Sequence, residues 1–243
     1  MAIRKRIGAL VPSTNTTAEG DFQLAAPAGV TIHGMRMWLT NEGLGTAESM
    51  DSMNDEIASG AKYLSTANVD AIAYLCTTGS FYKGPGWDNQ MCDIIQQHSG
   101  VPGIATSPSA VEGLKEMGAR KVSIATPYPD WNNVKLREYF SAAGFTVLNV
   151  DGDPVASKSG NQGINDQDPE RIVEFASSVC DPEADVLFCS CTAWRAMEAA
   201  DRLEQKVGKP VVASNQATVW KTFKTLGLKV RTKGFGQLLD QLA

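Results

Sequence analysis

Two pairs of landmarks recur in this chain at one spacing. A cysteine ends an apolar run and begins a polar turn at Cys76 and again at Cys191, 115 residues later. Pro12 and Pro127, each at the end of an expected strand, are also 115 residues apart. One offset shared by two pairs predicts that the chain is a tandem repeat of one α/β unit, since a repeat of this length implies a duplicated subdomain rather than a solenoid. A generic alternation of strands and helices that imitates a repeat is the alternative.

Short apolar runs alternate with longer amphipathic stretches, which is the pattern of βαβ units in a mostly parallel sheet. The expected strands are residues 6–11, 30–37, 69–75 and 103–105, then 122–125, 146–150, 186–189 and 211–213. The expected helices are residues 47–65, 88–98 and 109–117, then 131–142, 169–178, 193–207 and 217–226. The sequence thus predicts an α/β fold of two pseudo-symmetric subdomains, residues 1–117 plus 217–243 and residues 118–216. Each is expected to be a mostly parallel sheet flanked by helices, with the active site in the cleft between them.

Composition and charge narrow the classes of partner. The 43% hydrophobic and 20% charged residues are ordinary values for a soluble globular protein. The formal net charge of −5 argues against a nucleic-acid partner. No apolar stretch is long enough to span a membrane, so we expect no membrane contact. No signal peptide is recognised, so we expect free thiols and a cytoplasmic location.

The short supply of histidine limits the chemistry that this chain can perform. With only His33 and His98, a Ser-His-Asp triad or a His-rich metal site is difficult to build. No Gly-x-Gly-x-x-Gly loop follows the first expected strand, which argues against a nucleotide cofactor. We therefore expect no metal and no cofactor, and cysteine is the leading candidate for acid/base chemistry.

Polar turns are expected where the strands end, and open parallel sheets bind their ligands there. Cys191 and Thr192 precede a predicted helix whose N-terminal amides would stabilise a thiolate. Thr77 and Thr78 follow Cys76 in a tight turn that could direct backbone N–H groups at a carboxylate. Free cysteine most often packs as a small hydrophobic residue. Because these two occupy matched positions of a repeat, we interpret them as a catalytic pair. The four turns are residues 12–17, 76–80, 127–133 and 191–194.

Three more side chains are candidates for ligand binding. Asn15 could cap a helix, bind a ligand or do both. Tyr128 lies between two prolines at the equivalent strand end of the second half, and its hydroxyl is expected to point into the cleft. Asn161, a weaker candidate, lies in residues 152–168, which we expect to form a long loop and a candidate lid. Residues 81–87 are expected to line one wall of the cleft.

These motifs carry a family resemblance that spans nearly the whole chain. The segments Val11-Pro12-Ser13-Thr14-Asn15-Thr16-Thr17, Cys76-Thr77-Thr78-Gly79-Ser80-Phe81, Ala125-Thr126-Pro127-Tyr128 and Ser190-Cys191-Thr192 resemble the maleate cis-trans isomerase branch of the aspartate/glutamate racemase superfamily. That superfamily also includes arylmalonate decarboxylase. The resemblance implies two pseudo-symmetric α/β domains with the active site between them.

The resemblance also implies roles for individual residues. Cys76 resembles the isomerase nucleophile and Cys191 its opposing acid/base cysteine. Asn15, Tyr128 and, with a looser alignment, Asn161 resemble the residues that bind carboxylates. Arylmalonate decarboxylases bind one carboxylate with donors similar to those expected here, but they typically carry glycine at the position of Cys76, and this difference favours chemistry that uses two thiols. The decarboxylase-like donors are Thr77, Thr78 and Thr192.

What the resemblance implies is a cofactor-independent isomerase that converts a small dicarboxylate, maleate, to fumarate through a cysteine adduct. Two other reactions stay open on the same scaffold: racemisation of an amino or hydroxy acid, and an arylmalonate-type decarboxylation. A carboxylate-binding module with inert cysteines is the non-enzymatic alternative. The expected partners are a small carboxylate substrate and a second copy of the chain, because members of this superfamily often form dimers.

Overall fold

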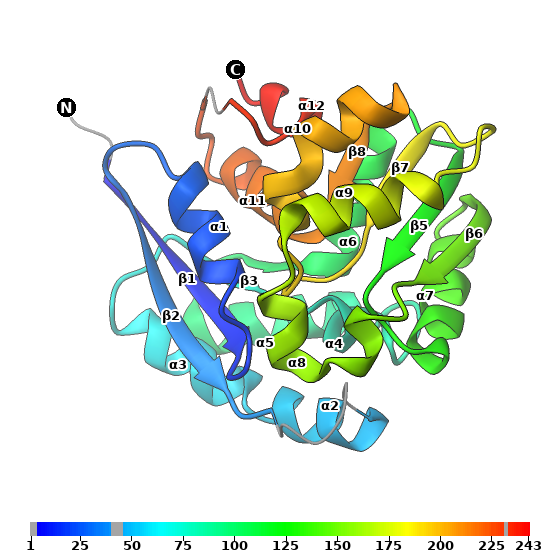
Figure 1. The fold of residues 1–243 in the computed structure, drawn as a ribbon. Coiled ribbons are helices and arrows are strands. Elements are labelled where there is room, and N and C mark those ends of the chain that lie inside the picture. Colours follow the sequence, from blue (N-terminus) through cyan, green and yellow to red (C-terminus); the bar gives the residue numbers. More distant parts are fainter. Residues whose placement is uncertain (1–3, 40–45, 231–232) are drawn as a thin grey trace.

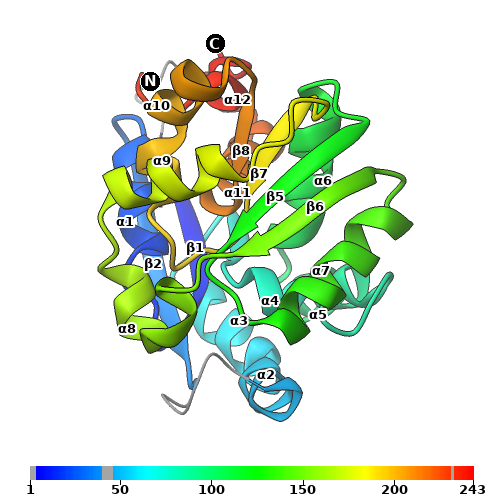
Figure 2. The ribbon, with the colours of Figure 1, turned by 45° about the vertical axis from the view of Figure 1, so that its right-hand side comes forward.

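Two parallel four-stranded sheets form the framework of the structure, a computed structural model that describes residues 4–39, 46–230 and 233–243 (Figure 1). The first sheet has the order β2-β1-β3-β4 and the second the order β6-β5-β7-β8, so the two halves repeat one topology. Figure 2 shows the four strands of the second sheet side by side. The strands are β1 (Lys5–Pro12), β2 (Val30–Met37), β3 (Ala71–Tyr74), β4 (Gly103–Ala105), β5 (Lys121–Thr126), β6 (Thr146–Gly152), β7 (Val186–Cys189) and β8 (Val211–Ala213).

Helices follow the strands in both halves, as the alternating pattern predicts. In the first half they are α1 (Ala18–Ala25), α2 (Ala47–Asn54), α3 (Ile57–Ser65), α4 (Thr77–Phe81), α5 (Trp87–Ser99) and α6 (Thr106–Glu116). In the second they are α7 (Asp130–Ala142), the 3-10 turn η1 (Ala156–Lys158), α8 (Gly160–Asn165), α9 (Pro169–Ser178), α10 (Ala196–Val207), α11 (Ser214–Thr225) and α12 (Gln237–Asp240). The predicted α/β fold with two pseudo-symmetric halves is confirmed.

The central strands explain why the sequence pattern was informative. Every residue of β3 and β7 is buried, because helices cover both faces of a parallel sheet, and such strands consist of continuous apolar residues. The edge strands β2 and β6 are only partly buried. The carboxyl ends of β3 and β7 lead directly to Cys76 and Cys191.

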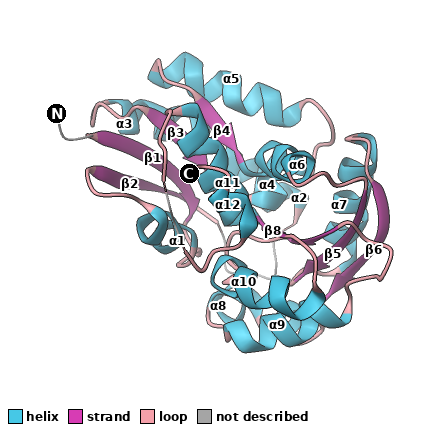
Figure 3. Cartoon of the chain, turned by 90° about the horizontal axis from the view of Figure 1, so that it is seen from above, coloured by secondary structure: helices cyan, strands magenta, loops and turns pink. Residues whose placement is uncertain are grey.

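The two halves meet through equivalent helices of the repeat. Helices α6 and α11 pack against each other between the two sheets (Figure 3). The Thr218 hydroxyl donates to Thr106 Oγ1 at 3.3 Å inside this contact. Lys221 pairs with Glu112 at 2.6 Å on its exposed side. The division of the chain into residues 1–117 plus 217–243 and residues 118–216 stays a prediction.

Four local expectations were wrong. The expected helix 47–65 is two helices, α2 and α3, because the chain turns at Asp55 and Glu56, where the Glu56 carboxylate accepts a hydrogen bond from the Trp38 backbone N–H. The expected turn 76–80 contains α4, and the expected turn 127–133 runs into α7. The expected loop 152–168 contains η1 and α8. Helix α1 was not predicted at all.

Within the described residues, no helix combines the length and the apolar character that crossing a membrane requires.

Candidate active site

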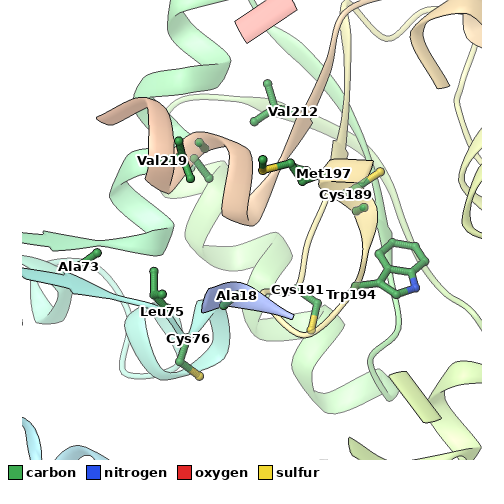
Figure 4. Close-up of a cluster of buried hydrophobic side chains, with 14 of the residues drawn as sticks. Ala18, Ala73, Leu75, Cys76, Cys189, Cys191, Trp194, Met197, Val212 and Val219 are labelled. Atoms are coloured by element: carbon green, nitrogen blue, oxygen red, sulfur yellow. The ribbon is translucent and has the colours of Figure 1, made fainter. Parts of the chain in front are cut away.

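All eight predicted site residues line one cavity of about 60 Å³ between the two halves. Four of them precede β5 and four follow it, so neither half forms the site alone. Figure 4 shows the Cys76 and Cys191 sulfur atoms pointing to the same side of the buried cluster, while the Cys189 sulfur points away. The eight residues are Asn15, Cys76, Thr77, Thr78, Tyr128, Asn161, Cys191 and Thr192.

Cys76 caps a short helix. It follows β3 in an extended conformation and is the N-cap of α4, where the Gly79 backbone N–H donates to Sγ at 3.4 Å. Burial raises the pKa of the Cys76 thiol to about 12, against the opposing effects of Gly79 and of a hydrogen bond with Tyr74. A negative charge on Cys191 also raises this pKa, so the two sulfur atoms interact electrostatically.

Cys191 occupies a different local structure from the one predicted. Helix α10 begins only at Ala196, so its N-terminus does not directly follow the cysteine. Burial raises the pKa of Cys191 to about 11, and the backbone N–H groups of Ala193 and Trp194 and the Tyr128 side chain oppose that rise. The donors that favour a thiolate here therefore come from a turn and a tyrosine rather than from a helix end.

Ser214 connects the two cysteine loops. Its Oγ accepts a hydrogen bond from the Cys191 backbone N–H at 3.1 Å and another from the Thr77 hydroxyl at 3.1 Å. Ser214 is fully buried at the start of α11. The Ser214 hydroxyl thus holds Thr77, which follows Cys76, at a fixed distance from Cys191.

Asn15 and Thr192 form a second brace across the halves. Asn15 Oδ1 accepts from the backbone N–H groups of Thr17, the N-cap of α1, and Ala18, its first residue, at 2.9 and 3.0 Å, so Asn15 satisfies these groups without being the N-cap itself. Its Nδ2 donates to Thr192 Oγ1 at 3.1 Å, and the Thr192 hydroxyl donates to the Leu75 carbonyl at 3.0 Å. Asn15 combines these contacts with a place in the cavity wall.

Two asparagines present unused polar groups. Asn132 Nδ2 donates to Thr78 Oγ1 at 3.2 Å, while the buried Asn132 Oδ1 has no protein partner. The buried Asn161 Nδ2 also has no protein partner. Both side chains line the cavity, and buried polar groups are normally hydrogen-bonded. A ligand that supplies an acceptor to Asn161 would satisfy one of them.

Asn161 lies in a helix that is fastened to the first half. Asn165, at the end of α8, donates to the Thr14 carbonyl at 2.9 Å and accepts from the Thr16 backbone N–H at 3.0 Å. These bonds hold residues 152–168, which were expected to form a loop, against the turn that follows β1. Whether this segment opens as a lid stays a prediction.

The apolar walls come from residues that the sequence did not reveal. Leu39, Met50 and Ile164 line the cavity, and nothing in the sequence distinguishes them from core residues. The expected wall, residues 81–87, does not line it. Phe81 packs in the core with its ring 6.2 Å from that of Tyr139. Asn132 was missed because it reads as an ordinary residue of the helix after β5; its nearness to Tyr128 was the available signal.

Charged side chains are rare around the site. Among the described residues that line the cavity, none is a lysine or an arginine. No group of three or more His, Cys, Asp or Glu side chains suited to a metal ion occurs in the described ranges. A carboxylate bound here would rely on neutral donors such as amides, hydroxyls and backbone N–H groups.

Known proteins resemble this chain along its whole length. A family model described as arylmalonate decarboxylase matches residues 11–239. Maleate isomerase from Geobacillus stearothermophilus is 28% identical, over 99% of this chain and 99% of the relative. Arylmalonate decarboxylase from Bordetella bronchiseptica is 24% identical, over 82% and 84%.

A solved structure agrees with the fold. It is a cysteine-to-serine mutant of the maleate cis-trans isomerase from Nocardia farcinica, with a covalently bound succinylcysteine intermediate. The two structures superpose with a TM-score of 0.89 at 26% identity, over 99% of both chains. The family match covers nearly all of the sequence, and the resemblance to maleate isomerases seen in its motifs is confirmed. This chain therefore belongs to the arylmalonate decarboxylase family.

Proposed function

We propose that this protein is an isomerase that converts maleate to fumarate through a covalent adduct of Cys76. The observation that carries the proposal is the pair of cysteines, one from each half of the repeat, on one small cavity lined by neutral hydrogen-bond groups. A volume of about 60 Å³ suits a small acid better than an aryl-substituted malonate. The succinylcysteine of the Nocardia farcinica isomerase gives a precedent for a cysteine adduct in a relative.

The first step needs one negative charge on the pair of thiols. We assign this charge to Cys191, because the backbone N–H groups of Ala193 and Trp194 and the Tyr128 side chain all favour its thiolate. Its thiolate accepts the Cys76 proton as Cys76 Sγ attacks one carbon of the double bond. The electron pair of the double bond moves to the neighbouring carbon, where the adjoining carboxylate delocalises it as an enediolate.

The remaining steps return both cysteines to their starting state. The Cys191 thiol gives its proton to the carbanion, which leaves a saturated adduct, and the new single bond rotates. Cys191 then removes a proton from the same carbon, the double bond re-forms and the Cys76 thiolate leaves and recovers its proton. Rotation about a single bond replaces rotation about a double bond, which removes most of the barrier.

The two carboxylates would be held by neutral donors. The Asn161 amide has an unused donor, and the Thr78 oxygen already accepts from Asn132, so its own proton is free to point at a ligand. Thr77, Tyr128 and Thr192 are the other proposed binding groups, with the second amide hydrogen of Asn15. These donors would lower the energy of the enediolate as it forms.

A second candidate reaction is racemisation of an amino or hydroxy acid. Two thiols on one cavity can remove a proton from one face of a carbon and return it to the other. Decarboxylation of a substituted malonate is less favoured, because it would leave Cys76 without a role. A carboxylate-binding module with inert cysteines is the non-enzymatic outcome.

Three further properties belong to the same proposal: the reaction needs no cofactor, the enzyme works in the cytoplasm and the chain forms a homo-oligomer. Activity after extensive treatment with a chelator, cell fractionation and sedimentation velocity would test them in turn. Loss of activity on chelation, a membrane or secreted fraction, or a monomer would contradict them.

The proposed reaction is tested by incubating the purified protein with maleate and following fumarate by proton NMR. Loss of conversion in Cys76→Ala, with conversion retained in Cys189→Ala, would support it. Cys189 is a matched control because it is also buried but directs its sulfur away from the pair. No conversion by the parent protein, or full activity in Cys76→Ala, would contradict it. Loss of optical rotation of an amino acid, or CO₂ release from a substituted malonate, would identify the alternatives.

A further inference from the structure

A buried chain of hydrogen bonds behind Cys76 takes no part in the mechanism above. The Tyr74 hydroxyl donates to Asn54 Oδ1 at 2.5 Å, and Asn54 Nδ2 is 3.4 Å from the Tyr82 hydroxyl oxygen, to which it donates. The Tyr82 hydroxyl donates to Asp51 Oδ1 at 2.6 Å. Tyr74 is fully buried, whereas Asp51 is half-exposed and pairs with Lys83. This series of hydrogen bonds thus links the interior beside Cys76 to the surface.

Gly79 makes room for this arrangement. A Cβ atom at position 79 would lie 2.0 Å from the Tyr74 hydroxyl oxygen, which is far inside contact distance. The Gly79 N–H donates to Cys76 Sγ at 3.4 Å, and its carbonyl accepts from Asn54 Nδ2 at 3.2 Å. The absent side chain therefore brings the Tyr74 hydroxyl into the same turn that holds the sulfur, and the Tyr74 side chain lowers the pKa of Cys76.

The Tyr74 hydroxyl has one proton and two acceptors. While Cys76 is a neutral thiol, the proton lies on the short bond to Asn54 Oδ1, and the oxygen can accept from the S–H group. When Cys76 is a thiolate, the same proton can turn to the sulfur. Hydrogen bonding to a charged form favours that form, so this change would lower the cost of ionising the cysteine.

We propose that Tyr74, whose proton Asn54 Oδ1 accepts while Cys76 is neutral, is a positioning residue that orients the Cys76 sulfur and stabilises its thiolate as it forms. The inference deepens the proposed function, because it rests on Cys76 as the nucleophile. The other titratable or charged groups near it are Cys191 and Tyr128 across the cavity, and Tyr82, Asp51 and Lys83 at the outer end of the chain.

The test is the rate of Cys76 alkylation by iodoacetamide between pH 7 and 10, resolved from the other cysteines by peptide mass spectrometry. Tyr74→Phe removes only the hydroxyl, and we expect Cys76 to react about tenfold more slowly at each pH, with the Cys191 rate unchanged. Tyr139→Phe is the matched control. It removes another buried hydroxyl, which donates to Asp88 Oδ2 at 2.6 Å, and it should leave the Cys76 rate unchanged.

A Tyr74→Phe profile that superposes on that of the parent, or an equal slowing of Cys191, would overturn the inference. If Tyr74→Phe does not fold, Asn54→Ala provides a second test, in which the change in rate should be opposite. This variant frees the Tyr74 proton for the sulfur, so Cys76 should be alkylated faster. Unchanged or slower alkylation in that variant contradicts the proposal.

The alkylation assay needs no substrate, which separates this inference from the proposed reaction. Slower alkylation in Tyr74→Phe without any conversion of maleate would leave the inference standing and remove the isomerase. Conversion of maleate, together with a parent-like alkylation profile in Tyr74→Phe, would support the isomerase and overturn the inference about Tyr74. If both hold, kcat for maleate should fall in Tyr74→Phe by about the same tenfold factor, with KM unchanged.

Discussion

Cys76 and Cys191 occupy equivalent positions of the repeat, at the ends of β3 and β7, yet their surroundings differ. Cys76 begins a five-residue helix and has one backbone N–H, that of Gly79, and a tyrosine behind it. Cys191 begins a non-helical turn, and the backbone N–H groups of Ala193 and Trp194 and the Tyr128 side chain lower the pKa of its thiol. The extra donor accompanies the smaller rise in pKa, to about 11 rather than about 12. The repeat explains why the two thiols lie at equivalent strand ends. The residues around each thiol then distinguish the proposed nucleophile from the proposed acid/base group.

The largest effect is expected for Cys76→Ala, because it removes the proposed nucleophile. We expect kcat/KM for maleate to fall by roughly 10⁴-fold or more. The intact mass of the parent protein quenched during turnover should show an adduct of one maleate, and that of the variant should not. An adduct that persists in the variant would assign the nucleophile to the other half.

Cys191→Ala is expected to cost less, about 10²- to 10⁴-fold, since it removes an acid/base group and leaves the nucleophile. Mass spectrometry of this variant should still reveal slow labelling of Cys76 by maleate. Equal losses in both variants, with no adduct in either, would mean that the cysteines exchange protons as equals, as in a racemase.

Asp21→Asn tests a buried carboxyl that is linked through Asn215 to the residue after Cys191. Burial raises the pKa of Asp21 to about 7, and its Oδ2 accepts from Asn215 Nδ2, which also donates to the Thr192 carbonyl. A raised pKa means that the stabilising contribution is complete at acidic pH and is lost as pH rises towards and through 7. Between pH 5 and pH 8, the free energy of unfolding should fall by roughly 2–4 kcal/mol more in the parent than in the variant.

Urea titrations of both proteins at the two pH values measure that difference. Asp51→Asn is the control, since Asp51 lies on the Cys76 side at the surface. Its pKa is lowered, first by its hydrogen bond with Lys83, so this carboxyl is charged at both pH values. An equal pH response of the parent and Asp21→Asn would show that Asp21 stays charged throughout.

Tyr128→Phe should have the smallest effect. The Tyr128 side chain lowers the pKa of Cys191, so its loss should slow Cys191 alkylation about tenfold and leave Cys76 less affected. This is the mirror image of the result expected for Tyr74→Phe. Alkylation rates resolved for each cysteine across pH 7 to 10 would check it, and a slowing confined to Cys76 would reverse the pairing of tyrosines with thiols.

Much of this fold could be predicted from the sequence, because buried parallel strands leave continuous apolar runs. The expected bounds of β2, β4, β7 and β8 agree with the structure. The pairing of Cys76 with Cys191 could also be predicted, because a repeat places equivalent residues at equivalent strand ends.

The failures have local causes. Helix α4 consists of Thr-Thr-Gly-Ser-Phe, a poor helix-forming segment, and it forms because Cys76 caps it and its buried side chains pack. Leu39, Met50 and Ile164 look like any core residue, so the walls of the cavity could not be separated from the core. Asn132 enters the site only because of the direction in which α7 leaves β5. Such information is tertiary and is absent from a single sequence.

Ser214 has a consequence for how this scaffold could acquire another substrate. Its hydroxyl accepts from Thr77 and from the Cys191 backbone, so this small side chain of α11 is one of the groups that set the gap between the reacting sulfurs. A bulkier or shorter residue at position 214 would change the distance between the two sulfur atoms without replacing either cysteine. Substrate length in this architecture can therefore be adjusted from a third element, without altering either nucleophile or proton donor.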